Sequence, residues 1–102
     1  MLEVKAYVRE NMLDKVVDKL SEIPGVPGIM VGEVIGIANT ETKDKLVQTK
    51  LAKLELDIPE SLLKAVVNTI IESAKTRRGH PGDGKIIVTP VNQIFKIAGG
   101  SS

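Results

Sequence analysis

Two segments of this chain alternate between apolar and polar residues, and each is followed by a stretch with helical spacing. Residues 2–9 place four apolar side chains on one face, and residues 52–58 repeat the pattern in a strand that can begin near Val47. Strict alternation predicts half-buried strands, because successive side chains of a strand point to opposite faces of a sheet. The repeated strand-then-helix order restricts the possible folds more than any other feature of the sequence.

Apolar residues spaced three and four apart predict one helix in each half of the chain. The first helix begins with Asn11 as its capping residue and continues to Ile23, where the Pro- and Gly-rich stretch 24–28 ends it. The second follows Pro59, which the first turn of a helix tolerates, and covers residues 62–74.

The composition of the remaining segments predicts the rest of the secondary structure. Residues 29–37 are apolar and β-branched, which predicts a strand buried on both faces. Residues 38–46 are polar and predict an exposed loop. Three short segments complete the chain: a strand at 86–89 ended by Pro90, a short terminal strand at 94–97 and a flexible end at 99–102.

The resulting order is β-α-β-β-α-β with a short final strand. Right-handed crossovers then predict an α+β, ferredoxin-like fold, with an antiparallel sheet and both helices on one face, in a single domain over residues 1–98. The other face of the sheet has no helix to cover it. Gly32, Gly36 and the apolar residues of the second strand predict that this face meets other copies of the chain.

Charge and composition exclude several classes of protein. A net charge of +1 over 102 residues argues against a nucleic-acid or membrane surface, which needs a concentrated basic excess. No apolar run approaches the roughly 20 residues that a membrane span needs, so we expect no membrane insertion. The absence of cysteine excludes disulfides and thiol chemistry and fits a cytoplasmic protein.

The stretch Thr76–Val88, TRRGHPGDGKIIV, is the chemically most distinctive part of the chain. It holds three of the nine glycines, three basic residues and the only histidine. Glycines allow main-chain amides to approach an anion closely, and Lys85 adds a mobile positive charge, as in a phosphate-binding loop. A tight turn that leads into a strand, with Lys85 solvated, accounts for the same residues.

Neither nucleotide hydrolysis nor catalysis by His80 follows from this stretch. Gly79–Lys85 has the spacing G-x-x-x-x-G-K, but Ile86 stands where a P-loop needs Ser or Thr, and the context is helix-loop-strand. No serine or cysteine nucleophile is paired with His80, and no metal ligands accompany it at the usual spacing. We therefore expect no catalytic residue and no metal site. An enzyme that uses His80, such as a phosphatase, is kept as a third hypothesis.

The string Gly82–Val88, GDGKIIV, resembles the most specific motif of the PII signalling family. The resemblance covers most of the chain: VKAYVR at 4–9, LDKV at 13–16, VPGIMVGEVIG at 26–36, LELDIP at 54–59 and VVNTII at 66–71 are supporting patterns. It implies a homotrimer of ferredoxin-like subunits that binds an adenine nucleotide (ATP, ADP or AMP) between subunits and regulates an enzyme or a membrane transporter.

The resemblance also implies roles for particular residues. Gly82, Asp83, Gly84 and Lys85 would hold phosphates, Gly36 would line the cleft, and Lys96 would add charge from the neighbouring subunit. The loop after the second strand would contact the regulated partner, through Asn39, Thr40, Glu41, Thr42, Lys43, Asp44 and Lys45.

Some positions depart from the family pattern. The partner loop is short and has no tyrosine, so control by modification of a loop tyrosine is not expected. No glutamine follows Gly36, which leaves magnesium and a 2-oxoglutarate response open. Met30 and Ala98 replace a frequent threonine and arginine. These two replacements favour the alternative hypothesis, a nucleotide-independent binding module of a transporter or metal-efflux system.

Overall fold

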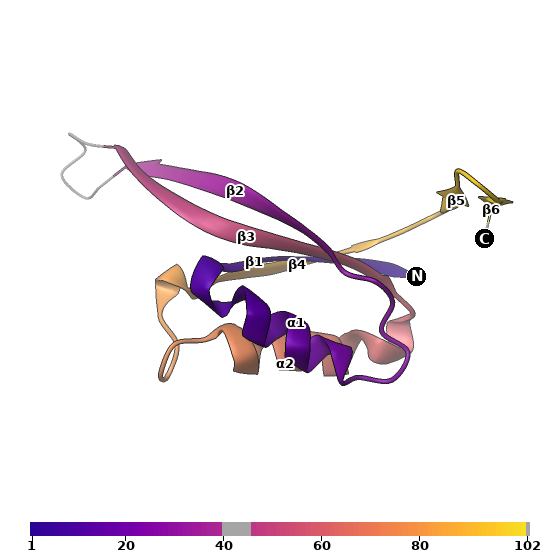
Figure 1. Ribbon diagram of the computed structural model, residues 1–102, viewed down its shortest axis with the longest axis horizontal. Coiled ribbons are helices and arrows are strands. Elements are labelled where there is room, and N and C mark those ends of the chain that lie inside the picture. Colours follow the sequence, from indigo (N-terminus) through magenta and orange to yellow (C-terminus); the bar gives the residue numbers. More distant parts are fainter. Residues whose placement is uncertain (40–45, 102) are drawn as a thin grey trace.

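Four antiparallel strands form one sheet in the order β2-β3-β1-β4, and both long helices lie against the same face of it (Figure 1). The protein is described here by a computed structural model that covers residues 1–39 and 46–101. The elements are β1 (Leu2–Arg9), the 3-10 turn η1 (Glu10–Met12), α1 (Leu13–Ser21), β2 (Met30–Asn39), β3 (Leu46–Ile58), the 3-10 turn η2 (Glu60–Leu62), α2 (Leu63–Ala74), the 3-10 turn η3 (Pro81–Asp83), β4 (Gly84–Pro90), β5 (Phe95–Lys96) and β6 (Gly100–Ser101).

The hydrophobic core lies between the helices and the two central strands. Alternate residues of β1 from Val4 to Val8, and of the second half of β3 from Ala52 to Ile58, are buried against the apolar stripes of α1 and α2. The buried apolar residues are Val4, Ala6, Val8, Val16, Leu20, Ala52, Leu54, Leu56, Ile58, Val66, Ile70 and Ala74. Burial of a Val, Leu or Ile side chain contributes about 1.5–3 kcal/mol, so the alternation stabilises this architecture. The structure confirms the predicted ferredoxin-like fold.

The first helix begins differently from the sequence-based prediction. Asn11 was expected to cap the first helix, but it lies inside the 3-10 turn η1, and α1 starts after Met12 without a side-chain cap. The second helix also follows a 3-10 turn, η2, and its N-cap residue Leu62 makes no side-chain capping hydrogen bond. A 3-10 turn with an acidic residue, Glu10 or Glu60, therefore opens each helix.

Strand β2 is not buried on both faces, as its composition predicted. It pairs only with β3 and forms an edge of the sheet, and the β2–β3 ribbon extends past the ends of the helices (Figure 1). Ile35 and Ile37 are therefore 59% and 60% exposed. The predicted loop at 38–46 was also too long, because ladder pairing of Ala38 with Val47 and of Asn39 with Leu46 extends both strands.

The C-terminal segment forms a small hairpin away from the main sheet. Strand β4 is longer than the predicted 86–89, and the expected terminal strand is the two-residue β5, which pairs with β6. Gly100 and Ser101, which we expected in a flexible end, are thus paired with β5. Figure 1 places this hairpin at the opposite end of the molecule from the turn η3 and the tip of the β2–β3 ribbon.

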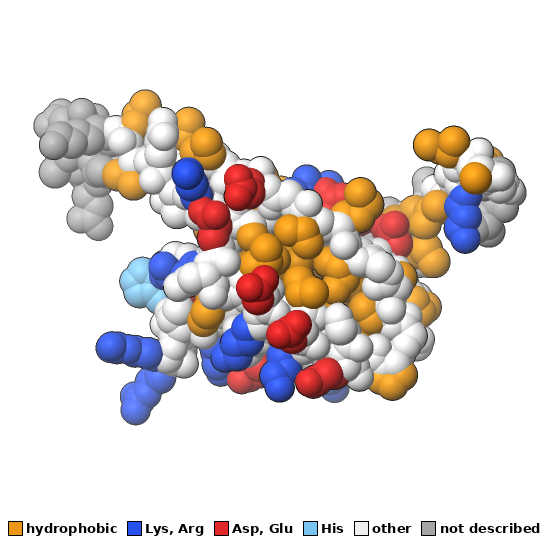
Figure 2. Space-filling view, in the orientation of Figure 1, with side chains coloured by type: hydrophobic (Ala, Val, Ile, Leu, Met, Phe, Trp, Pro, Cys, Tyr) orange, Lys and Arg blue, Asp and Glu red, His pale blue; other side chains and the backbone are white. Residues whose placement is uncertain are grey.

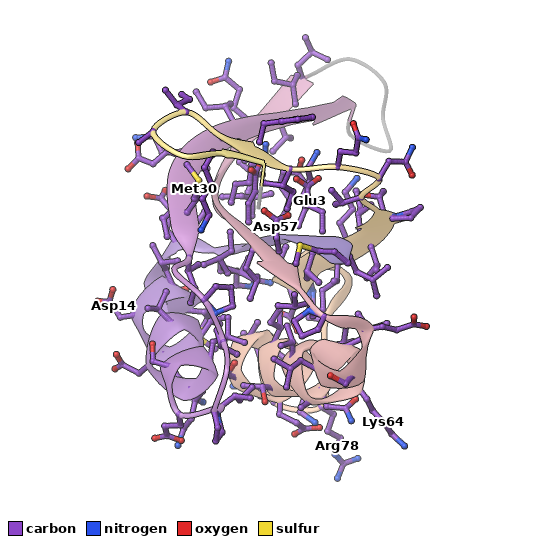
Figure 3. All side chains as sticks on the ribbon, turned by 90° about the vertical axis from the view of Figure 1, so that its right-hand side faces the viewer. Glu3, Asp14, Met30, Asp57, Lys64 and Arg78 are labelled. Atoms are coloured by element: carbon purple, nitrogen blue, oxygen red, sulfur yellow. The ribbon has the colours of Figure 1, made fainter. Side chains whose placement is uncertain are left out.

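The helix-free face of the sheet carries charged residues across its central strands. Lys53 Nζ lies 2.6 Å from Glu55 Oε1, and Lys5 Nζ lies 3.4 Å from Glu3 Oε1. Figure 3 shows Glu3 and Asp57, which are direct cross-strand neighbours, on this face of the sheet. Contact between this face and other copies of the chain stays a prediction.

Candidate functional site

The Asp83 carboxylate holds together the loop that joins α2 to β4. Its Oδ1 accepts hydrogen bonds from Thr76 Oγ1 at 2.7 Å and Arg9 Nε at 3.1 Å, and its Oδ2 accepts from the main-chain N–H groups of Thr76 at 2.9 Å and His80 at 2.8 Å. The partners come from the start of the loop, its middle and the end of β1. One side chain thus fixes residues that lie far apart in the sequence.

Asp83 is ionised in this arrangement. Hydrogen bonds from the main chain and hydroxyl of Thr76, followed by those from His80 and Arg9, hold the pKa of this carboxyl far below its usual range. The side chain is only 13% exposed, and the Asp83 N–H donates to the His80 carbonyl at 2.9 Å. Both the carboxylate and the amide of Asp83 are thus engaged in bonds that shape the loop, and its predicted contact with a phosphate stays a prediction.

Gly84 is the position where the loop comes closest to β1. Its φ is +114°, and a Cβ built on it would lie 1.6 Å from the main-chain oxygen of Tyr7. No other residue type fits this approach, because the clash involves main chain on both sides. The glycine therefore lets the loop enter β4 directly beside β1.

His80 and Arg9 meet over Gly82. The Gly82 N–H donates to His80 Nδ1 at 2.9 Å, and Arg9 Nη2 lies 3.3 Å from the same nitrogen. A Cβ on Gly82 would lie 2.8 Å from Arg9 Nη2 and 3.2 Å from His80 Nδ1. The two side chains thus occupy the space directly above the Gly82 main chain.

A groove of about 680 Å³ connects this loop with β2. Gly82, Gly84 and Lys85 line one wall, and Gly36 with its neighbours Ile35 and Ile37 lines the other. Lys85 is exposed, and its Nζ lies 5.6 Å from the centre of the ring of Tyr7, which also lines the groove. A cation held over an aromatic face keeps its charge while it is partly ordered, so the groove presents a positioned positive charge.

The structure brings together four of the six residues predicted to bind a ligand. Gly36, Gly82, Gly84 and Lys85 share the groove, and Asp83 supports the loop from beside it. Lys96 is separate: it lies on β5 in the C-terminal hairpin, at the far end of the molecule (Figure 1). Of the predicted partner residues, Asn39 ends β2, and Thr40 to Lys45 lie outside the described residues.

Three residues of the site were missed by the reasoning from sequence. Arg9, Tyr7 and Thr76 contact the loop, yet Arg9 and Asp83 are 74 residues apart. The only available signal was the alternation of residues 2–9, which places Tyr7 and Arg9 on the same polar face of β1. Pairing that face with the glycine loop needs the strand register, where Tyr7 opposes Lys85 and Val8 opposes Gly84.

Basic side chains gather at the same end of the molecule. Arg77 and Arg78 are exposed on the turn that precedes His80, and Figure 2 shows Lys and Arg side chains projecting there. Figure 3 shows Arg78 pointing away from the body of the protein on the side of α2. The net charge of +1 is thus unevenly distributed, and the loop is a positive region.

Among residues 1–39 and 46–101, no group of three or more His, Asp and Glu side chains is arranged to hold a metal ion. No helix in this described part of the chain is both long and apolar enough to cross a membrane.

Comparison with known proteins finds one family along nearly the whole chain. The family model described as "Nitrogen regulatory protein P-II" matches residues 1–101. The nitrogen regulatory protein P-II of Azospirillum brasilense and P-II 1 of Escherichia coli K12 are each 31% identical, over 98% of this chain and 94% of their own length. A P-II homolog of Arabidopsis thaliana is 34% identical over 96% of this chain, which spans 53% of that relative's length.

The fold agrees with that comparison. The crystal structure of Arabidopsis thaliana PII bound to citrate superimposes with a TM-score of 0.76 and 35% sequence identity, over 97% of this chain and 84% of the other. The likeness therefore covers nearly the whole chain.

Proposed function

Because this chain belongs to the P-II family of nitrogen regulatory proteins, we propose that it is a trimeric regulator whose state is set by an adenine nucleotide in the groove between β2 and the glycine loop. Proteins of this family are signalling proteins and not enzymes, so a catalytic role for His80 is set aside. The proposed ligand is ATP, ADP or AMP. The proposed output is control of a partner enzyme or transporter in the cytoplasm.

The observation that carries the proposal is the meeting of Gly36 with Gly82, Gly84 and Lys85 in one groove. A volume of about 680 Å³ lies within the range of small-molecule sites. A Cβ built on Gly36 would make only ordinary van der Waals contacts within the protomer, at 3.7 Å from the Thr49 main-chain oxygen and 3.9 Å from Leu51 Cδ1. Since the protomer does not need a glycine there, a ligand that approaches β2 closely accounts for it.

The chemistry of the groove favours an anion. Lys85 supplies a charge positioned over Tyr7, and the basic turn at Arg77 and Arg78 adds long-range attraction. The Arabidopsis relative was crystallised with citrate, a small carboxylate anion, which supports the class of ligand but not its identity. Apolar walls from Val34, Ile35 and Ile37 would accommodate a base beside the phosphates.

A trimer accounts for two features that a single chain leaves unexplained. Large apolar side chains are exposed on the β2–β3 ribbon, on β4 and around β5: Met30, Val31, Ile35, Ile37, Leu46, Val47, Ile87, Val88, Phe95 and Ile97. Patches of this kind mark interaction surfaces. Lys96 lies too far from the groove of its own subunit, so its proposed contact with phosphate requires the neighbouring subunit.

The proposed partner contact is made by residues 39–45, which connect β2 to β3 in the sequence. The ribbon projects beyond the helices and passes Gly36, so the groove and the partner segment share one structural element (Figure 1). A ligand can control that segment only if its affinity differs between the states of the segment. Magnesium would enter as part of the nucleotide complex, with no protein ligand assigned to it.

Calorimetry and light scattering test this proposal together. ATP, ADP and AMP are titrated into the full chain at known oligomeric state, with Lys85→Ala as the variant and Lys64→Ala, an exposed lysine on α2 (Figure 3), as the matched control. We expect a mass three times the 11.0 kDa of one chain, and binding that Lys85→Ala weakens and Lys64→Ala does not. Binding of a partner without heat from any nucleotide would select the alternative, a nucleotide-independent module.

A further inference from the structure

His80 occupies the two donors that an anion would use at the loop. The Gly82 N–H and the Arg9 guanidinium both approach Nδ1, at 2.9 and 3.3 Å. Neither donor can accept a hydrogen bond, so Nδ1 carries its lone pair and the imidazole is neutral, with its proton on Nε2. An anionic oxygen seated against Gly82 would need this same position.

We propose that His80 is a competitive gate of the binding loop: its neutral imidazole fills the anion position over Gly82, and ligand binding requires that the imidazole leave it. This inference rests on the proposed function, and it names how that site is regulated. The space is already full, because a Cβ on Gly82 would lie within 3.2 Å of both His80 Nδ1 and Arg9 Nη2. An anion and the imidazole therefore cannot occupy it together.

Protonation of the His80 imidazole would release it from the position over Gly82. A proton on Nδ1 removes the lone pair that Gly82 N–H and Arg9 use, and histidine is the side chain that ordinarily changes charge between pH 5 and 8. The charged neighbours are Arg9 from β1 and Asp83 from η3, with Arg77 and Arg78 earlier in the same loop. Protonated His80 would be repelled by Arg9, while Asp83 would still hold the His80 main-chain N–H.

The His80 imidazole can leave its position without breaking the hydrogen bonds that hold the loop together. Asp83 keeps its bonds to Thr76, to the His80 N–H and to Arg9 Nε, and none of these involves the imidazole. The His80 side chain is exposed, so it can rotate into solvent. Acidification thus frees one amide and one guanidinium nitrogen and adds a positive charge, and all three changes favour an anion.

Two variants separate the gate from the titration of the nucleotide itself. In His80→Asn, Oδ1 stands at the same number of bonds from the main chain as Nδ1 and accepts from Gly82 N–H at every pH, because asparagine is a good capping residue that does not titrate. In His80→Ala the position over Gly82 is empty at every pH. Protonation of the ligand phosphates is common to all three proteins and cancels in the ratio of their affinities.

The experiment measures ADP affinity by calorimetry in metal-free buffer at pH 8.0 and 5.5. We expect the affinity of the wild type relative to His80→Asn to rise about 3- to 10-fold on acidification, the range of one hydrogen bond, and His80→Ala to bind more tightly than His80→Asn at both pH values. In ligand-free protein, the amide resonance of Gly82 should shift as the imidazole titrates in the wild type and stay fixed in His80→Asn.

The possible outcomes separate the His80 gate from the proposed nucleotide site. A wild-type to His80→Asn ratio that stays constant with pH, in proteins that bind ADP, overturns the gate and leaves the nucleotide site standing. Absence of ADP binding in all three proteins, while the Gly82 resonance still follows the imidazole, overturns the proposed function and with it the competition. A Gly82 resonance that ignores the imidazole overturns the gate by itself.

Discussion

Replacement of Gly84 by alanine tests the geometry on which the binding loop depends. The added Cβ would lie 1.6 Å from the Tyr7 main-chain oxygen, whereas real Cβ atoms stay at least 3.0 Å away, so β4 and β1 would have to separate locally by about 1.4 Å. The φ of +114° adds backbone strain for a residue with a side chain. Strain of roughly 1–3 kcal/mol and overpacking of a similar size together predict a loss of about 2–6 kcal/mol in the free energy of unfolding.

Gly79→Ala is the matched control for that substitution. Gly79 also has a positive φ, +104°, but nothing lies within 4 Å of the position of a Cβ. The control therefore carries the strain alone, and we expect it to lose only about 1 kcal/mol. Urea unfolding followed by far-ultraviolet circular dichroism, at one fixed protein concentration, measures both variants because association makes stability depend on concentration.

The difference in stability between Gly84→Ala and Gly79→Ala shows whether the loop lies as close to β1 as the structure places it. Equal stabilities for the two variants, within about 1 kcal/mol, would mean that β1 does not approach the loop as closely as the structure places it. A Gly84→Ala protein that fails to fold, beside a folded Gly79→Ala protein, agrees with the account, because the predicted loss is a large part of the stability of a domain of this size.

Three further substitutions test other parts of the account. Lys85→Ala should weaken nucleotide binding by about 1.5–3 kcal/mol, the scale of a hydrogen bond to a charged group, and unchanged calorimetric affinity would make the lysine a solvated residue. Asp83→Asn should remove an acid sensitivity of the folded state. The pKa of Asp83 is lowered in the folded state, so the stabilisation that this carboxylate provides is complete above about pH 4, near the pKa of an unfolded aspartate, and is lost as the pH falls below that pKa. Urea midpoints between pH 7 and pH 3 that fall equally in both proteins would contradict this. Leu54→Ala, at a fully buried position, should cost about 2–5 kcal/mol by the same unfolding assay, and a smaller loss would mean that the core closes around the cavity.

Much of the fold was predictable because its signals are local. The alternation in β1 and in the second half of β3 and the stripes of α1 and α2 each report burial on one side, and together they specify the order of elements. The composition of β2 was misleading for a physical reason. Its apolar residues indicate burial, but β2 is an edge strand of the sheet, and Ile35 and Ile37 stay exposed.

The site was predictable only where one continuous stretch carries it. The glycines and Lys85 lie within four residues, so their grouping was visible in the sequence. The role of Asp83 was not, because its partners come from β1 and from both ends of the loop. His80 stood out as the only histidine, but its function as a cap on Gly82 depends on a distance that no spacing rule predicts.

A crystal structure of the full chain grown with ADP would locate the ligand, the neighbouring subunits and the His80 ring in one measurement. We expect a trimer with the diphosphate against Gly82, Gly84 and Lys85, the base toward Gly36 and Ile37, Lys96 of the neighbouring subunit on the phosphates, and the His80 ring turned away from Gly82. ADP bound elsewhere, or a monomer that binds it without a neighbouring subunit, would contradict the account.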